Sequence, residues 1–360
     1  MLAVALVTLS TFAGAPYPPS SVIAGIEWHW ETYRSAATGS DLWPVTWAVD
    51  DNLYSAWGDG GGFGGTAQTG RVALGFARIE GPPQHFNGVN VNGGKDPENP
   101  ATFPRFGKAG GLLACDGILY AWINRQDGRW PDVNQGLAWS TNKGRTWENS
   151  SWVFPKARDS FKPSTFLNCG REYADLPPQL EKFVYVYGIR QGDETNVYLC
   201  RVPTGRLRER AAFEFLAGLS GDQPRWSSKV ENLKPIFTDS RGLGDLPTVI
   251  YNARLNRFVL TLFHKGPGQL GVFDAPAPWG PWTTIAYYED WAGMGIEGHG
   301  LTCSFPAKWM SADGRECWCI FAAYGPGAKK GIQAHDRFNL VKAIFLLRSV
   351  NPGQKPPGGL

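Results

Sequence analysis

The chain has 360 residues, of which 42% are hydrophobic, 13% aromatic and only 19% charged, and its formal net charge is +3. The apolar fraction excludes a disordered chain, the scarcity of charge excludes a coiled coil, and the small net charge excludes a generic binder of nucleic acids or membrane surfaces. With 45 Gly and 27 Pro residues beside the many aromatic ones, the composition is typical of an all-β chain with frequent turns.

The amino-terminal segment has the pattern of a signal peptide. Residues 1–15 read MLAVALVTLSTFAGA, an apolar stretch that ends in a small-x-small sequence, although no Lys or Arg precedes it. We therefore expect residues 1–15 to be a signal peptide, residues 16–350 to form a single catalytic domain, and residues 351–360 to be a flexible tail. The protein is then expected to be secreted or periplasmic.

Export would permit disulfide bonds among the six cysteines. None of them has the C-x-x-C spacing of a zinc site. Cys303 could face Cys317 or Cys319 across a hairpin, and buried free thiols are the alternative.

One pattern recurs along the chain: an apolar strand, a polar turn, and a second strand rich in aromatic residues. It is found at 43–59, 110–125, 164–190, 247–265 and 304–323. Alignment of the second strands places five residues in register, namely Tyr54, Tyr120, Tyr185, Leu260 and Trp318. A second, more polar β segment follows each hairpin, so each unit is expected to contain four strands.

Five such units predict a five-bladed β-propeller. The fifth unit is one strand short, and residues 21–30 (SVIAGIEWHW) are expected to supply that strand and close the ring. Residues 206–216 (RLRERAAFEFL) predict one short helix inserted into the third blade. A β-sandwich, or a propeller with more and shorter blades, is the alternative fold. Residues 140–147 (STNKGRTW) match the Asp-box turn signature, which is structural and supports the propeller.

The ends of the inner strands of a propeller surround one central pocket. Although charged residues are scarce, they occupy most of the expected pocket positions. We predict that these residues bind substrate, together with Trp43, whose ring could stack on a sugar: Lys108, Arg125, Lys162, Arg190, His264, Glu297 and His299. The cations would bind an anionic substrate group or neutralise nearby aspartates.

The clearest candidates for catalysis are Asp41 and Asp59. They flank a hairpin whose turn is Asp50-Asp51, so each lies about nine residues from the corner and the two are expected to be cross-strand neighbours. Repulsion and partial burial raise the pKa of one carboxyl, which can then donate a proton, while the other stays ionised as nucleophile or base. Their alternative role is to cap turns, since Asp59 lies in a glycine-rich segment.

Three segments resemble the bacterial domain of unknown function 4185: Asp41 to Gly60, Asp274 to Trp282, and Lys308 to Gly314. The resemblance extends over roughly residues 22–348. It implies a five-bladed propeller related to the furanosidase clans, some of whose members are retaining, endo-acting arabinan hydrolases with two catalytic aspartates in blade one. Those positions fall on Asp41 and Asp59. The match is also distantly similar to glycoside hydrolase family 43, with Asp41 in the place of that family's general base. Lys108 and Lys162 stand where that family has its other two carboxylates.

Our leading hypothesis is a secreted glycoside hydrolase that cleaves a cell-wall or extracellular polysaccharide, with a furanoside or an acidic glycan as candidate substrate. The first alternative is a polysaccharide lyase, in which Lys108, Arg125 or Arg190 would neutralise a uronate and a group such as His264 or His299 would take the proton. The second is a carbohydrate-binding propeller without catalysis. We expect a monomer with no organic cofactor, metal site, nucleic-acid partner or membrane association.

Overall fold

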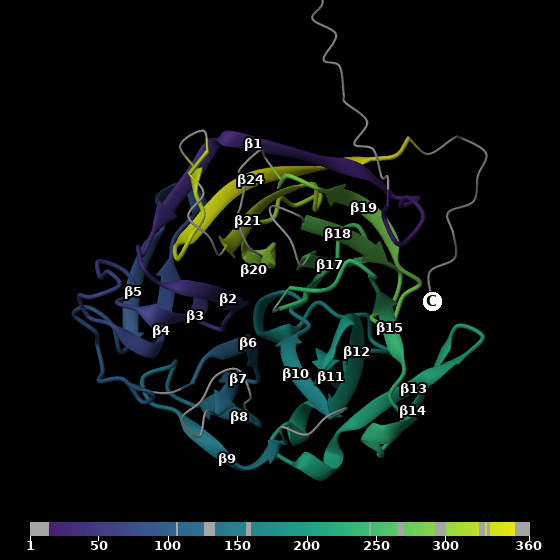
Figure 1. Ribbon diagram of the computed structural model, residues 1–360, viewed down its shortest axis with the longest axis horizontal. Coiled ribbons are helices and arrows are strands. Elements are labelled where there is room, and N and C mark those ends of the chain that lie inside the picture. Colours follow the sequence, from purple (N-terminus) through teal and green to yellow (C-terminus); the bar gives the residue numbers. More distant parts are fainter. Residues whose placement is uncertain are drawn as a thin grey trace, which may run out of the picture.

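The computed structural model describes residues 14–105, 107–125, 134–155, 160–244, 246–264, 270–291, 300–323, 328–329 and 332–349. These residues form five antiparallel sheets arranged as blades around a central axis (Figure 1). The prediction of an all-β, five-bladed β-propeller is therefore confirmed. No helix in this part of the chain is long and apolar enough to cross a membrane.

Blades one, two and four each contain four strands in chain order. Blade one is β2 (Asp41–Trp47), β3 (Leu53–Gly60), β4 (Val72–Glu80) and β5 (Asn87–Asn92). Blade two is β6 (Ala109–Cys115), β7 (Ile118–Arg125), β8 (Asn134–Ser140) and β9 (Glu148–Phe154). Blade four is β16 (Thr248–Asn252), β17 (Arg257–Phe263), β18 (Leu270–Ala275) and β19 (Thr283–Tyr288).

Blade three carries extra strands. It begins with β10 (Phe161–Phe166), β11 (Phe183–Arg190) and β12 (Asp193–Pro203), beside which lie β13 (Glu214–Ser220), β14 (Gln223–Ser227) and β15 (Pro235–Thr238). Short 3-10 turns connect the strands: η1 (Pro83–His85), η2 (Arg171–Tyr173), η3 (Thr204–Arg206), η4 (Arg210–Ala212), η5 (Val230–Asn232) and η7 (Ala307–Trp309). A two-stranded ribbon is formed by β22 (Ala328–Lys329) and β23 (Ile332–Gln333).

Blade five joins the two ends of the chain. Its strands are β20 (Gly300–Ser304), β21 (Glu316–Ala323), β24 (Phe338–Leu347) and β1 (Ile23–Ala36). The antiparallel pairing of β1 with β24 runs from Ile23 opposite Leu347 to Ala36 opposite Phe338. The predicted closure by an amino-terminal strand is confirmed, and this strand continues past the predicted end at residue 30.

The predicted helix at residues 206–216 is wrong. Two 3-10 turns, η3 and η4, occupy its first half, and β13 begins at Glu214. Phe213 and Phe215 are two residues apart, so in an extended chain their rings project to the same side. Both are buried against Phe154 of blade two, with ring centroids 5.7 and 6.3 Å away. Burial of both rings requires the period of a strand, and this packing outweighs the local helix propensity.

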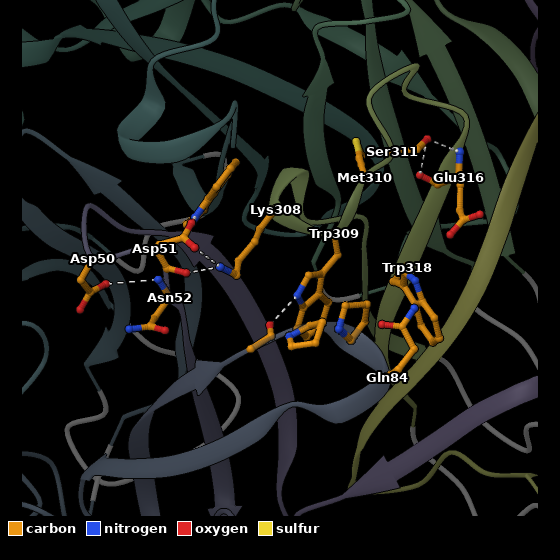
Figure 2. A pocket seen from close by; sticks show the side chains of 14 residues that line it. Asp50, Asp51, Asn52, Gln84, Lys308, Trp309, Met310, Ser311, Glu316 and Trp318 are labelled. Carbon is orange, nitrogen blue, oxygen red and sulfur yellow. Dashed lines mark hydrogen bonds and ion pairs between the residues drawn. The ribbon is translucent and has the colours of Figure 1, made fainter.

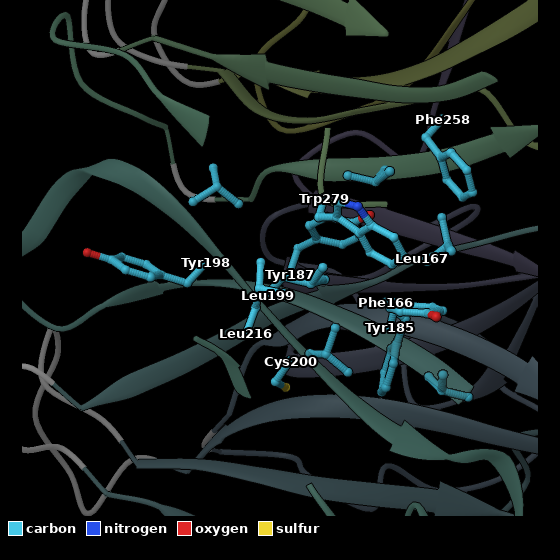
Figure 3. Close-up of a cluster of buried hydrophobic side chains, with 14 of the residues drawn as sticks. Phe166, Leu167, Tyr185, Tyr187, Tyr198, Leu199, Cys200, Leu216, Phe258 and Trp279 are labelled. Carbon is cyan, nitrogen blue, oxygen red and sulfur yellow. The ribbon is translucent and has the colours of Figure 1, made fainter. Parts of the chain in front are cut away.

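Aromatic side chains fill the space between blades. Tyr54, Tyr120, Tyr185, Leu260 and Trp318 lie on β3, β7, β11, β17 and β21, so each aligned residue is on the second strand of its blade, as predicted. Figure 3 shows the cluster around Tyr185 and Tyr187 of blade three and Trp279 of blade four. The Tyr187 hydroxyl donates to the carbonyl of Pro278 at 2.9 Å, which joins these two blades.

The Asp-box turn has the structural role expected of it. The Ser140 hydroxyl accepts the Gly144 N–H at 2.8 Å, and the Asn142 side chain accepts the Thr146 N–H at 3.0 Å. The Trp147 ring stacks on Phe76 of blade one with ring centroids 4.0 Å apart. The turn therefore fixes the contact between blades one and two.

All six cysteines are buried free thiols. Cys303 lies opposite Phe321 on the neighbouring strand, so Cys319, two residues away, projects from the same face. The two sulfur atoms are 3.1 Å apart. Of the two partners predicted for Cys303, the structure selects Cys319.

The closure of the ring predicts that β1 is essential for stability. Ile23, Ile26, Trp28 and Trp30 of this strand pack on the fifth blade. Ile23 is fully buried and the other three are partly buried. A fully buried apolar side chain of this size is worth roughly 1.5–3 kcal/mol, so together the four supply a large share of the usual net stability of about 5–15 kcal/mol. Deletion of residues 14–36 should abolish the cooperative thermal transition seen by near-UV circular dichroism. Deletion of residues 351–360 is the matched control, and equal melting temperatures for the two truncations would contradict the prediction.

Candidate active site

The β2–β3 hairpin places Asp41 and Asp59 at its open end. Asp41 is paired with Gly58, so Asp59 follows the residue directly opposite it. Asp59 adopts a left-handed backbone with φ of 55°, which turns its side chain out of the regular alternation of the strand. The register therefore brings the two carboxylates to one end of one hairpin.

Asp41 is held in a low-dielectric environment. A Cβ added at Gly58 would lie 2.3 Å from Asp41 Oδ1 and 2.9 Å from Cδ of Lys108, so the missing side chain of Gly58 makes room for both groups. The Oδ1 atom is buried and has no hydrogen-bond partner among the described residues. Burial raises the pKa of Asp41 to about 7, and although the charge of Lys108 opposes this rise, the charge of Asp59 adds to it. A carboxyl group with such a pKa is suited to donate a proton near neutral pH.

Asp59 has the opposite environment. Its Oδ1 is 2.8 Å from Nζ of Lys108 and 3.0 Å from Nη2 of Arg71, and its side chain is 46% exposed. Arg71 also donates to the Asp59 main-chain carbonyl. Lys108 is fixed by a further hydrogen bond to the carbonyl of Ala73 at 2.8 Å. The Asp59 carboxylate is therefore held by two cations at the edge of the solvent.

Asp336 is a third carboxylate at this site, and it is missing from the sequence prediction. Its carbonyl accepts the N–H groups of Gly39 and Ser40 at 2.7 and 3.1 Å, so the loop before β24 is bonded to the residues that precede Asp41. Burial raises the pKa of Asp336, its ion pair with His335 opposes this rise, and the charge of Asp59 adds to it. The charge of Asp336 in turn raises the pKa of Asp41.

The predicted cations have different roles. Lys108 lies between the two aspartates, as described above. The Arg190 guanidinium donates to the carbonyls of Val230 and Glu231 at 3.1 and 3.3 Å and lies over the Tyr198 ring, so its contacts are within blade three. Lys162 is a partly buried residue of β10, paired with Ile189.

Two predicted substrate contacts are corrected by their burial. Trp43 is fully buried, stacks on Trp57 and donates to the carbonyl of Ser40 at 2.8 Å, so no sugar reaches its ring. His264 is also fully buried and pairs with Asp239 at 3.1 Å. Burial alone would raise the pKa of Asp239, but the contacts with His264, Arg241 and other neighbours lower it overall. Trp43 and His264 are therefore packed inside the fold, where a substrate does not reach them.

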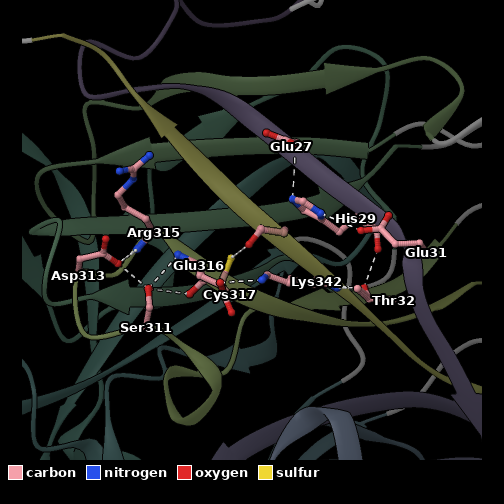
Figure 4. A network of polar contacts seen from close by, with 11 residues as sticks. Glu27, His29, Glu31, Thr32, Ser311, Asp313, Arg315, Glu316, Cys317 and Lys342 are labelled. Carbon is pink, nitrogen blue, oxygen red and sulfur yellow. Dashed lines mark hydrogen bonds and ion pairs between the residues drawn. The ribbon is translucent and has the colours of Figure 1, made fainter. Parts of the chain in front are cut away.

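Three further predicted residues are not placed here. Glu297 and His299 lie outside the described residues, and for Arg125 only the backbone, paired with Asn134, is described. His29 is on the outer strand β1 between Glu27 and Glu31, at 3.4 and 2.9 Å, where its contacts are structural (Figure 4). Within the described residues, no group of three or more His, Cys, Asp or Glu side chains could hold a metal ion.

Sequence reasoning missed Arg71 and Asp336 for different reasons. Arg71 follows a glycine-rich loop and directly precedes β4, so it lay outside the aligned strand ends. Asp336 precedes β24, the last strand of the incomplete fifth unit. The pairing of β24 with β1 could have pointed to Asp336, because that pairing brings residues near 336 next to residues near 41.

The fold is that of a five-bladed propeller of the type found among glycoside hydrolases. The chain is similar to a presumed hydrolase from Bacteroides ovatus ATCC 8483, with a TM-score of 0.56 at 12% identity over 86% of this chain and 87% of that one. It is also similar to the catalytic domain of a GH62 α-L-arabinofuranosidase from Coprinopsis cinerea, with a TM-score of 0.50 at 8% identity over 86% and 97%. A GH43_1 enzyme from Xanthomonas citri has a TM-score of 0.47 at 12% identity over 91% and 96%.

The family resemblance is confirmed for residues 119–297, which match the family described as Domain of unknown function (DUF4185) and include the segment from Asp274 to Trp282. No curated protein matches the chain in sequence.

The raised pKa of Asp41 predicts a loss of stability as the pH rises. Between the ordinary value of 3.8 and about 7, the folded chain binds more protons than the unfolded chain, so the free energy of unfolding falls through this range. Asp41→Asn removes the buried ionisation. At pH 8 this variant should be more stable than the wild type by on the order of 2 kcal/mol after allowance for solvent screening, and the gain should shrink at pH 5.

Urea unfolding at both pH values measures this difference. Asp313→Asn, which replaces a solvent-exposed aspartate, is the control and should show no such gain. Identical pH dependence of the Asp41→Asn variant and the wild type would show that Asp41 does not titrate as described.

Proposed function

We propose that this protein is an exported glycoside hydrolase that cleaves a cell-wall or extracellular polysaccharide by a two-carboxylate mechanism. The observation that carries the proposal is the contrast between two neighbouring carboxylates. Asp41 is half-buried, with its Oδ1 atom enclosed and its pKa raised, whereas the Asp59 side chain is 46% exposed and paired with Arg71 and Lys108. Glycosidases need one protonated and one ionised carboxyl group flanking the scissile bond.

The contrast assigns a role to each residue. Asp41 donates its proton to the departing glycosidic oxygen, so that the leaving sugar exits as an alcohol. Asp59, as the anion, either attacks the anomeric carbon or takes a proton from the water that attacks it. Lys108 and Arg71 hold Asp59 in place. Burial, aided by the nearby charges of Asp59 and Asp336, raises the pKa of Asp41 and so favours its protonated form.

The geometry weighs against the two rival functions. Elimination from a uronate requires an accessible base and a free cation. Among the candidates whose side chains the structure describes, His264 is fully buried, Lys108 is paired with Asp59, and Arg190 is bonded within its own blade. A binding propeller with one site per blade would show repeated sites. The Asp41–Asp59 arrangement has no equivalent at the corresponding described positions of blade two, where Lys108 and Arg125 stand.

Substitution of either aspartate tests the mechanism. Asp41→Asn and Asp59→Asn should each lower kcat by roughly 10²–10⁴-fold while the circular dichroism spectrum stays unchanged. Products released from a panel of neutral and acidic polysaccharides are weighed by mass spectrometry. Saturated oligosaccharides are expected, and products one water lighter would indicate elimination instead. Asp116→Asn, on the exposed β6–β7 turn, is the matched control, and full activity in either active-site variant would refute the assignment.

The electrostatic role of Asp336 gives a second test. The activity of the wild type should fall as the pH rises through about 7, because Asp41 then loses its proton. Asp336→Asn removes a negative charge that raises the pKa of Asp41, so this descending limb should move to lower pH. The measurement is kcat/KM from pH 4 to 9 for Asp336→Asn, with Asp313→Asn as the charge-matched control. An unmoved limb would show that Asp336 does not act on the proton donor.

A further inference from the structure

A second pocket lies at the opposite end of the β2–β3 hairpin. It has a volume of about 580 Å³ and is formed where blades one and five meet, by the turn at Asp50, by η1 and by η7 (Figure 2). β2 separates it from Asp41 by six residue steps at about 3.3 Å each, so it is roughly 20 Å from the proposed catalytic pair. Its size is within the roughly 300–1,000 Å³ usual for small-ligand sites.

The walls of this pocket are aromatic and flat. Trp47, Trp309 and Trp318 line it, together with Pro82 and Pro83. Trp47 is partly exposed, and its indole N–H is directed to Asp51 Oδ1 at 3.0 Å, which fixes the orientation of the ring. Rigid indole faces offer a large apolar contact at a low cost in side-chain entropy, which suits a ring-shaped ligand with apolar C–H faces.

Three neutral polar groups in the lining have no partner. The side-chain amides of Gln84 and Asn52 and the indole N–H of Trp318 make no hydrogen bond to any described residue. Gln84 is solvent-exposed, while Trp318 is only 4% exposed. A side-chain amide can both donate and accept a hydrogen bond, and a hydroxyl group can do the same, so the two groups are suitable partners. The pocket thus combines flat apolar walls with unused neutral donors and acceptors.

The charged groups of the lining are already neutralised. Asp51 pairs with Lys308 at 2.9 Å (Figure 2), and Glu316 pairs with Lys342 at 2.7 Å (Figure 4). Asp50 pairs with Lys143 at 3.2 Å. A cation or an anion would have to disrupt one of these pairs, whereas an uncharged ligand leaves them intact. The lining therefore favours a neutral molecule.

We propose that this pocket binds a short segment of neutral oligosaccharide, apart from the catalytic pair. A sugar ring stacks on the partly exposed indole of Trp47, and the sugar hydroxyls bond to Gln84, Asn52 and Trp318. The proposal deepens the proposed function, on which it rests for the class of ligand. In a hydrolase of long polysaccharides, such a site holds the polymer on the enzyme while another part of the chain is cleaved.

Binding is measured by isothermal titration calorimetry in an Asp41→Asn background, which prevents turnover. The probes are arabino-, xylo-, cello- and manno-oligosaccharides, with oligogalacturonate as the acidic comparison. We expect at least one neutral probe to bind, and Gln84→Ala and Trp47→Ala each to weaken its binding at least tenfold. Gln223→Ala, which removes an exposed glutamine from β14 of blade three, should leave binding unchanged.

The outcomes separate this proposal from the proposed function. Absence of binding by every neutral probe, preference for oligogalacturonate, or undiminished binding in Gln84→Ala would overturn the proposal even if the enzyme hydrolyses glycans. Binding that is lost in Gln84→Ala would support it even if no glycan were hydrolysed. Gln84 is exposed and its side chain makes no hydrogen bond to any described residue, so Gln84→Ala should leave the fold intact. This variant therefore still tests the pocket if Trp47→Ala does not fold.

Discussion

The pairing of β1 with β24 is the constraint on which the rest of this protein depends. It joins two ends of the chain that are more than three hundred residues apart and brings blade five against blade one. At its inner end, Ala36 lies opposite Phe338, and the Phe338 ring packs on Trp43 with centroids 5.3 Å apart. The loops that carry Asp41 and Asp336 emerge directly beside this contact. Closure of the ring therefore stabilises the fold and assembles the candidate site at the same time.

The candidate site shows how one hairpin gives two like residues opposite properties. Asp41 and Asp59 are almost opposite each other, yet Gly58 leaves Asp41 turned into a buried space, while the left-handed backbone at Asp59 directs its carboxylate towards Arg71 and Lys108. Lys108, at the start of blade two, acts differently on the two aspartates. It forms an ion pair with Asp59, whereas its charge only opposes the rise in the pKa of Asp41. Asp41 and Asp59 are residues of the same type, so the difference between them comes from their surroundings.

The same hairpin links the two sites of the molecule. Its open end carries the aspartates, and its turn contributes Asp50, Asp51 and Asn52 to the second pocket. Both sites lie where blade one meets blade five, which is the seam closed by β1. The charge pairs around the second pocket also contrast with those of the first: they neutralise each carboxylate separately, whereas the first site holds three carboxylates close enough to affect one another.

The sequence by itself determined the all-β class, the five repeated units, the closing strand and the position of both aspartates at one end of a hairpin. These features depend on strand periodicity and on pairing between neighbours in sequence, which local residues encode. Only the tertiary structure decided that Trp43 and His264 are buried, that the segment around Phe213 is extended, and that Arg71 and Asp336 join the aspartates. Burial and contact between distant segments arise from packing across blades, and a linear pattern of residue types does not specify which side chain faces the core and which faces the pocket.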